Sequence, residues 1–260
     1  MSAIFVDSHC HLAQYPDALA VLDRGQSAGV VTVVVTESPS DYRSVALRLG
    51  RREGVRVALG AHPLRASQLN ALELAQFDRL VSRVDYVGEV GLDGSRDGRA
   101  SIEAQRRVFD RVLANPETRC KVLSVHSRGA EAETIDRLAA AGCVAILHWY
   151  SGALKHLDAA VRAGLWFSVN PAMLRSRNGQ SIIAALPPDR VVTESDGPHV
   201  RVGRSYAEPA DMPKVIKGLS EIWGVSVEEA SRSVFDTMGR IFAAANNRPV
   251  DQPGGAGSLR

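Results

Sequence analysis

Short runs of apolar, mostly β-branched residues alternate along this chain with longer segments that have helical spacing. Continuous apolar runs of this length are typical of parallel strands that are buried on both faces. Their alternation with helices predicts parallel β-α-β units, and eight such units predict a (β/α)8 TIM barrel, an α/β fold. A doubly wound open sheet is the alternative. We expect strands at 3–6, 30–35, 55–59, 86–90, 122–125, 144–147, 165–169 and 191–193.

The segments between these strands have the periodicity of amphipathic helices. We expect helices at 18–28, 41–52, 72–84, 102–113, 132–141, 154–163, 179–186, 213–223 and 227–245. Four helices are followed by a glycine in the C-cap position, namely Gly29, Gly54, Gly142 and Gly164. One barrel takes about 250 residues, so we expect a single domain over 1–245. The tail, 246–260, is rich in proline and glycine, and we expect it to be disordered.

The charge of the chain narrows the partners that it can bind. The 31 basic and 29 acidic residues leave a net charge of +2, which is short of the strongly basic surface of a protein that coats nucleic acid. The 3 cysteines make an odd number without metal-type spacing, which indicates reduced thiols. We expect no signal peptide and no membrane span, and therefore a cytoplasmic protein.

Histidines gather at the predicted strand ends, which in a barrel surround the active site. Five of the 7 histidines follow a predicted strand. His9 and His11 are two apart on an extended segment, so both point to the same side, while Cys10 points into the core. The five are His9, His11, His62, His126 and His148.

Two carboxylates join these histidines, because Glu89 and Asp196 also lie at predicted strand ends. Four of the imidazoles, those of His9, His11, His126 and His148, are taken as ligands with the two carboxylates. Six ligands exceed those of one tetrahedral ion and suit two divalent ions bridged by a carboxylate. A chain of this size does not need metal to fold, so the site is expected to be functional. These ligand types suit Mg²⁺, Mn²⁺ or Zn²⁺ and do not select among them.

Six short motifs occur in a fixed order along most of the chain. In these motifs the chain resembles the TatD-type metal-dependent deoxyribonucleases. The match runs over about residues 4–243. The motifs are D-S-H-C-H at 7–11, G-A-H-P at 60–63, G-E-V-G-L-D at 88–93, H-S-R at 126–128, H-W-Y-S-G at 148–152 and E-S-D-G-P at 194–198. The resemblance implies a TIM-barrel hydrolase that cleaves phosphodiester bonds in DNA.

The resemblance also implies roles for individual residues. His9 and His11 would hold one ion with Asp196, Glu89 would bridge both ions, and His126 and His148 would hold the second. Mg²⁺ is the common ion of the family. The implied catalytic residues are Asp196, which orients water or accepts its proton, Glu89 and His62. The implied substrate contacts are His62, at the rim of the site, and Arg128, which is suited to a bidentate phosphate contact.

Within this family, three stretches are most similar to QatD, the nuclease of Qat anti-phage systems. They lie at 91–95, 167–176 and 193–198. This similarity implies a role in antiviral defence, with an ATPase and other Qat proteins as partners. The chain departs from commoner relatives at 94–98, where an aromatic-rich loop is replaced, and at Ala207-Glu208-Pro209, where the family has Asn-Glu-Pro. Both departures leave the substrate preference open.

Other polar and aromatic residues near the motifs have competing interpretations. Asp7 is expected to orient a histidine or cap a turn, and Asp93 either holds a histidine or stabilises a turn. Trp149 and Tyr150 are expected to pack the rim rather than stack on a base. Glu194 either supports the site or forms a surface ion pair.

For two of the remaining candidates we expect ordinary roles outside the site, and for two others a functional and a structural role are equally supported. His156 is expected on the surface and His199 in an ordinary loop. Arg175 and Arg177 bind phosphate at the rim or lie in a solvated loop. Two other functions compete with the nuclease. One is a hydrolase of the same superfamily acting on an amide or ester, although no lysine sits where such enzymes bridge their metals. The other is a catalytically silent component of a defence complex.

Overall fold

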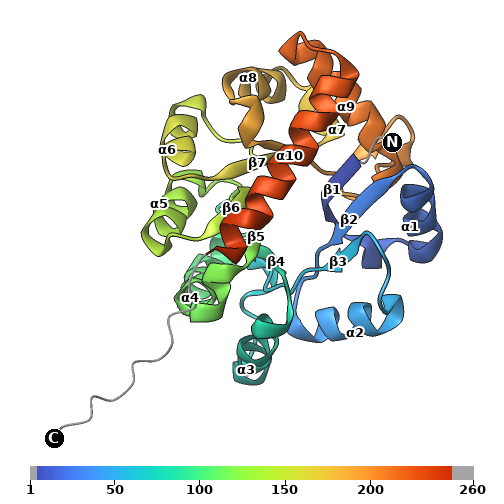
Figure 1. Cartoon of the computed structure of the whole chain (residues 1–260). Helices are drawn as coiled ribbons and strands as arrows, with labels where there is room; N and C mark the ends of the chain where they lie inside the picture. The colour runs from blue at the N-terminus through green and yellow to red at the C-terminus, as the bar shows by residue number, and fades with distance from the viewer. Residues whose placement is uncertain (1–4, 248–260) are drawn as a thin grey trace, which may run out of the picture.

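The computed structural model describes residues 5–247, and in it eight parallel strands form a ring with helices outside (Figure 1). All eight predicted strands are present and the TIM barrel is confirmed. The expected disordered tail lies outside the described residues from 248 onward. The strands are β1 (Phe5–Cys10), β2 (Val30–Val34), β3 (Val55–Val57), β4 (Tyr86–Gly91), β5 (Val122–His126), β6 (Val144–Leu147), β7 (Trp166–Val169) and β8 (Val191–Thr193).

Two seams close the ring between the sheets β1-β2-β3 and β4-β5-β6-β7-β8. Between β3 and β4, Leu59 pairs with Val87, and Thr36, which follows β2, exchanges backbone hydrogen bonds with Gly88 and Glu89 of β4. Between β8 and β1, the N–H of Asp196 donates to the His9 carbonyl at 2.9 Å and the N–H of His11 donates to the Gly197 carbonyl at 2.9 Å. This second seam sets residue 196 beside His9 of β1 and His11, which directly follows β1.

The helices follow the predicted segments, with local differences that have identifiable causes. The helix after β2 ends at residue 49 because Gly50, with φ 59°, takes the C-cap position that we expected for Gly54. The segment 154–163 divides into a 3-10 turn, Leu154–His156, and a short α-helix. The helices are α1 (Ala18–Ser27), α2 (Pro39–Leu49), α3 (Ala71–Leu80), α4 (Ile102–Ala114), α5 (Glu131–Ala141), α6 (Leu157–Arg162), α7 (Pro171–Arg175), α8 (Arg177–Ala185), α9 (Met212–Trp223) and α10 (Val227–Asn246).

Apart from short 3-10 turns, one helix and one hairpin were not predicted from the sequence, and both lie at strand ends that carry the motifs. Helix α7 follows β7 and is capped by Asn170, whose side chain accepts from the N–H groups of Ala172 and Met173. After β8, the antiparallel pair β9 (Arg201–Val202) and β10 (Ser205–Tyr206) forms a short hairpin. A helix of five residues and strands of two are too short to give a periodic signal.

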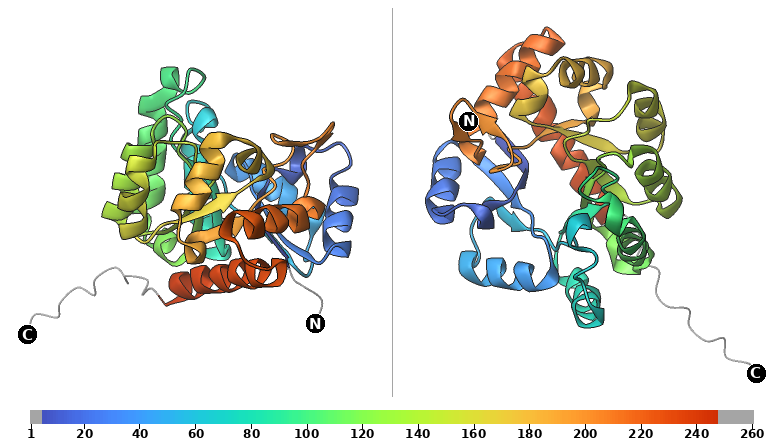
Figure 2. Two further views of the ribbon diagram at one scale, coloured as in Figure 1. Left: turned by 90° about the horizontal axis from the view of Figure 1, so that it is seen from above. Right: turned by 180° about the vertical axis from the view of Figure 1, so that it is seen from behind.

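Helix α10 lies across one end of the barrel, where its apolar face closes the core (Figure 2). It packs against β1, β5, β6 and β8, and the Phe242 ring meets Tyr86 at the start of β4 with 5.7 Å between ring centroids. Because Tyr86 begins its strand, α10 covers the end of the barrel where the strands start. The opposite end, where the strands finish, is free for a site.

Ile241→Ala is expected to lower the free energy of unfolding by about 2–5 kcal/mol, because it leaves a cavity in a closed core. The Ile241 side chain lies on the buried face of α10 and is 0% exposed. The matched control is Phe235→Ala on the same helix, where the ring is 45% exposed and the loss should be much smaller. Urea unfolding followed by circular dichroism measures both. Equal losses would show that the base of the barrel does not depend on α10 packing.

Candidate metal centre

The strand ends opposite α10 surround a polar pocket of about 700 Å³. Five histidines and five carboxylates line it, and they lie in or after seven of the eight barrel strands. A pocket of this size suits a small ligand or one unit of a polymer. The titratable lining residues are His11, Glu37, His62, Glu89, Asp93, Asp97, His126, His148, Asp196 and His199, with Arg65 and Arg128.

Glu89 of β4 stands between two sets of imidazoles. Its Oε2 lies 3.1 Å from His11 Nε2, 3.2 Å from His62 Nε2 and 3.5 Å from His9 Nε2. Its Oε1 lies 2.7 Å from His126 Nδ1 and 2.9 Å from His148 Nε2. Burial on its own raises the pKa of Glu89, but the surrounding imidazoles outweigh it and hold this pKa well below its ordinary range. Each carboxylate oxygen therefore faces its own set of nitrogen donors.

Asp196 reaches the first set from the seam between β8 and β1. Its Oδ1 lies 3.6 Å from Nε2 of both His9 and His11. The backbone turns sharply here, with φ 44° at Asp196. A Cβ at Gly197 would lie 2.0 Å from the Ala207 carbonyl oxygen, so the next position must be glycine. Burial, reinforced by the nearby carboxylates of Glu194 and Glu89, raises the pKa of Asp196 well above its ordinary range.

These donors fit divalent cations. Glu89 Oε2 and Asp196 Oδ1 are buried and lack hydrogen-bond partners among the described residues, and buried charged oxygens of this kind are stabilised by metal coordination. Three groups have ligand atoms that all lie within 4.8 Å of one another. They are His9, His11 and Asp196; His9, Glu89 and His148; and His62, Glu89 and His126. The third group places His62, which we expected at the rim, within reach of an ion.

Comparison with known proteins now decides the family. The sequence profile described as "TatD related DNase" matches residues 6–243, which is nearly the whole chain. The chain belongs to the TatD-related DNase family. This TatD-family chain is 30% identical to human deoxyribonuclease TATDN3, over 91% of this chain and 94% of the human protein. It is 27% identical to the 3'-5' ssDNA/RNA exonuclease TatD of Dickeya dadantii, over 87% of this chain and 92% of that protein.

A solved structure of the TatD family has the same architecture. YJJV, a TatD homologue from Escherichia coli, superposes with a TM-score of 0.85 at 24% identity, covering 94% of this chain and 99% of that one. The predicted TIM barrel and the predicted class, a metal-dependent hydrolase of the TatD family, are confirmed. Between residues 5 and 247, no helix is both long and apolar enough to span a bilayer.

His9 of this TatD-family site is oriented by a residue that sequence reasoning missed. Ser124 of β5 places its Oγ 2.7 Å from His9 Nδ1, which leaves Nε2 to face Glu89 and Asp196. Gly88 makes room for this contact, since a Cβ there would lie 2.9 Å from the Ser124 Cβ. Ser124 precedes His126 by two residues on the same strand, so both side chains point to the same side. This spacing is the sequence signal that could have identified Ser124 as part of the site.

Asp93 has both of the roles that the sequence left open. Its Oδ2 lies 2.7 Å from His126 Nε2, and its Oδ1 accepts from the Ser95 N–H at 2.8 Å. Against the opposing effect of burial, the contact with His126 lowers the pKa of Asp93 to about 2, and the contacts with Asp93 and Glu89 raise the pKa of His126 to about 9. Asp93 thus fixes the ring so that Nδ1 points at Glu89.

Asp93→Asn is expected to weaken metal binding by about 10- to 100-fold, because the carboxylate that orients a metal-binding histidine also raises its basicity. Isothermal titration of the purified protein with Mn²⁺ measures this effect without an activity assay. Asp97→Asn is the matched control, because Asp97 lies in the same loop and lines the pocket but is exposed and contacts no histidine among the described residues. An unchanged affinity in the Asp93 variant would contradict the positioning role.

Two further buried carboxylates hold the backbone around the site. Asp7 accepts hydrogen bonds from the N–H groups of His9 at 3.2 Å and Ser195 at 2.9 Å, so it caps turns on both sides of the β8–β1 seam. Glu194 accepts from the N–H of Trp149 at 3.0 Å and from the Asn170 amide at 3.1 Å. Both side chains are buried, so Glu194 supports the site and does not form a surface ion pair.

The rim residues separate into those that reach the pocket and those that do not. His199 was expected in an ordinary loop, and that prediction is wrong: its ring lies 4.6 Å from the His11 ring and lines the pocket. Arg128 is exposed, lines the pocket and has no ion pair within residues 5–247. Arg175 and Arg177 are exposed and do not line it. His156 is half-buried in the 3-10 turn before α6.

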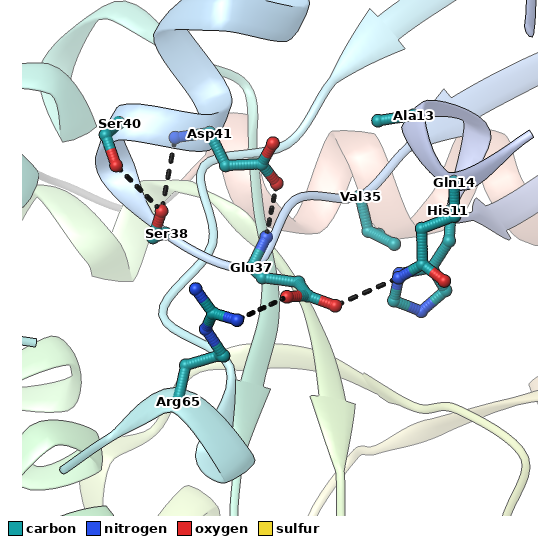
Figure 3. A pocket seen from close by; sticks show the side chains of 9 residues that line it. All are labelled: His11, Ala13, Gln14, Val35, Glu37, Ser38, Ser40, Asp41 and Arg65. Atoms are coloured by element: carbon teal, nitrogen blue, oxygen red, sulfur yellow. Dashed lines mark hydrogen bonds and ion pairs between the residues drawn. The ribbon is translucent and has the colours of Figure 1, made fainter. Parts of the chain in front are cut away.

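A second pocket, of about 690 Å³, adjoins the first beside α2 (Figure 3). The two pockets share His11, Glu37 and Arg65. Glu37 stands between its neighbours, accepting from the Gln14 side-chain amide at 2.9 Å and facing Arg65 at 3.8 Å (Figure 3). The two hollows therefore form a polar groove that extends past the histidine cluster.

Proposed function

We propose that this chain hydrolyses phosphodiester bonds of DNA with two divalent ions. The proposed ligands are His9, His11, Glu89, His126, His148 and Asp196, with Glu89 as the bridge. The observation that carries the proposal is the position of Glu89, whose two oxygens each face a separate set of imidazole nitrogens at 2.7–3.5 Å. A carboxylate between two groups of imidazole donors suits a pair of ions that carry out phosphodiester hydrolysis.

The side chains around the ions have distinct proposed roles. When bound, the ions would acidify a water molecule and stabilise charge on the phosphate, and Mg²⁺ is the ion that the family resemblance favours. Asp196 would orient the water and accept its proton, because its Oδ1 is buried and has no hydrogen-bond partner among the described residues. His62, 12% exposed beside Glu89, and Arg128, an exposed guanidinium, would contact the phosphate.

We further propose exonuclease activity on single strands. The support is the relative from Dickeya dadantii, which is named a 3'-5' ssDNA/RNA exonuclease and aligns with 87% of this chain. The near-neutral charge of +2 agrees with contacts confined to a groove, since wrapping a duplex would need many more phosphate contacts.

The cellular setting is a separate proposal. The stretches at 91–95, 167–176 and 193–198 support a QatD-type role in anti-phage defence, with an ATPase and other Qat proteins as partners. The odd number of cysteines supports a cytoplasmic location. We propose one hydrolase domain over 1–245, followed by a C-terminal tail.

The test is cleavage of end-labelled DNA by the purified protein with Mg²⁺ or Mn²⁺. Single-stranded, double-stranded and RNA oligomers labelled at either end give the preferred nucleic acid and the polarity, and EDTA provides the control. A ladder of products that shortens from one end is expected. Hydrolysis of small amides or esters with no cleavage of any oligomer would overturn the proposal.

A further inference from the structure

The loop after β6 sends three successive side chains in three directions. His148 points to Glu89, with 2.9 Å between His148 Nε2 and Glu89 Oε1. Tyr150 points into the core, where it is buried and its hydroxyl donates to the Ala153 carbonyl at 2.9 Å. Trp149, between them, lines the pocket of the metal centre and is half-buried. Both aromatic residues were expected to pack the rim. Tyr150 instead packs in the core, and Trp149 lines the pocket.

The direction of Trp149 depends on an unusual backbone conformation. Its φ is 38°, and Asp196 is the one other non-glycine residue between 5 and 247 with a positive φ. A left-handed conformation is unfavourable for a bulky residue, and such conformations cluster at functional sites. The buried Glu194 carboxylate holds the turn by accepting the Trp149 N–H at 3.0 Å. Packing alone would not need this turn, because the neighbouring Tyr150 already fills the core.

The surroundings of the indole ring indicate what it contacts. Among the described residues that line this pocket, Trp149 and Leu64 are the apolar ones, and the others are charged, imidazole or hydroxyl groups. Arg128 and Ser151 line the same pocket. A flat apolar ring that is left half-exposed among polar groups suits a flat aromatic ligand, and every nucleobase has such a face.

We propose that Trp149 is the stacking platform of a nucleobase subsite, which holds the base beside the phosphate at the metal centre. The inference rests on the proposed nuclease function and adds to it the group that the pocket recognises next to that phosphate. Stacking tolerates any base, so this subsite favours nucleic acid over other phosphodiesters without reading sequence. Trp149 acts on substrate binding and takes no part in bond cleavage.

The experiment compares two single-stranded oligomers of equal length, one with normal bases and one built throughout of abasic spacers. Wild-type protein is expected to cleave the normal oligomer with a kcat/KM about 5- to 150-fold higher, which is the factor that one stacked base contributes. Trp149→Ala should remove most of this preference by raising KM for the normal oligomer, with little change for the abasic one. Trp149→Phe, which keeps a stacking face, should restore most of the preference.

Trp166→Ala is the matched control, because Trp166 is also half-buried but lies at the start of β7, beside Arg190 and outside the pocket. Its preference should equal that of wild type, and thermal unfolding verifies that each variant is folded. Equal cleavage of both oligomers by wild type, or an equal loss on both in Trp149→Ala, would overturn the base subsite. Cleavage of neither oligomer by wild type would instead overturn the nuclease function itself.

Discussion

Glu89→Gln is expected to lower kcat/KM for DNA cleavage by on the order of 10³-fold or more. The carboxylate faces one set of imidazoles with Oε2 and the other with Oε1, so its loss removes a ligand from both proposed ions. Glutamine keeps the volume of the side chain but not its charge. We expect elemental analysis to find two divalent ions per chain in wild type and at most one in the variant.

Glu37→Gln is the matched control for this substitution. Glu37 lines the same pocket, but its carboxylate contacts Gln14 and Arg65 and lies outside the histidine cluster. Its metal content should equal that of wild type. Unchanged cleavage and unchanged metal content in Glu89→Gln, with the protein folded by circular dichroism, would eliminate the bridging role.

Divalent metal should raise the melting temperature of the protein. Ions bind the assembled site of the folded state and not the unfolded chain, so they stabilise the folded state by about 2.7 kcal/mol per site at a hundred times Kd. For a chain of this size that corresponds to roughly 5–10 °C. Differential scanning fluorimetry after EDTA treatment, with and without added Mg²⁺ or Mn²⁺, measures the shift.

The same titration on Glu89→Gln shows whether the shift comes from this site. The variant should lose most of the shift, because buried Glu89 and Asp196 supply the negative charge that the ions neutralise. A shift of equal size in wild type and variant would place metal binding elsewhere on the chain. No shift in wild type at millimolar metal would argue against an ion-binding site among these residues.

The barrel could be predicted from the sequence because each buried strand is a continuous apolar run, such as Val144–Leu147, which the structure reproduces to the residue. The elements and helix ends that could not be predicted have no periodic pattern in the sequence and are determined by single residues. Helix α7 depends on the Asn170 cap, and α2 ends at Leu49 because Gly50 after it has a positive φ. Strand β1 continues through the motif to Cys10, since its polar side chains find partners in the site.

The residues of the candidate site could be predicted because histidines and carboxylates at strand ends are conspicuous in the sequence. The residues that orient them could not. Ser124 is an ordinary strand residue until His9, 115 positions earlier, is placed beside it. His199 follows Asp196 in a loop, and nothing in the sequence places its ring 4.6 Å from His11. Such contacts depend on how the strands meet around the ring.

The seam between β8 and β1 sets the moment in protein synthesis at which the metal centre can first form. Ser195 donates to Asp7, 188 residues earlier in the chain, and Asp196 reaches His9 and His11 only through this contact region. At ribosomal rates of about 5–20 residues per second, roughly 10–40 s separate the emergence of these two segments. A nascent chain therefore carries its histidine pair without the carboxylate of Asp196, and the candidate site is complete only once nearly the whole barrel has been made.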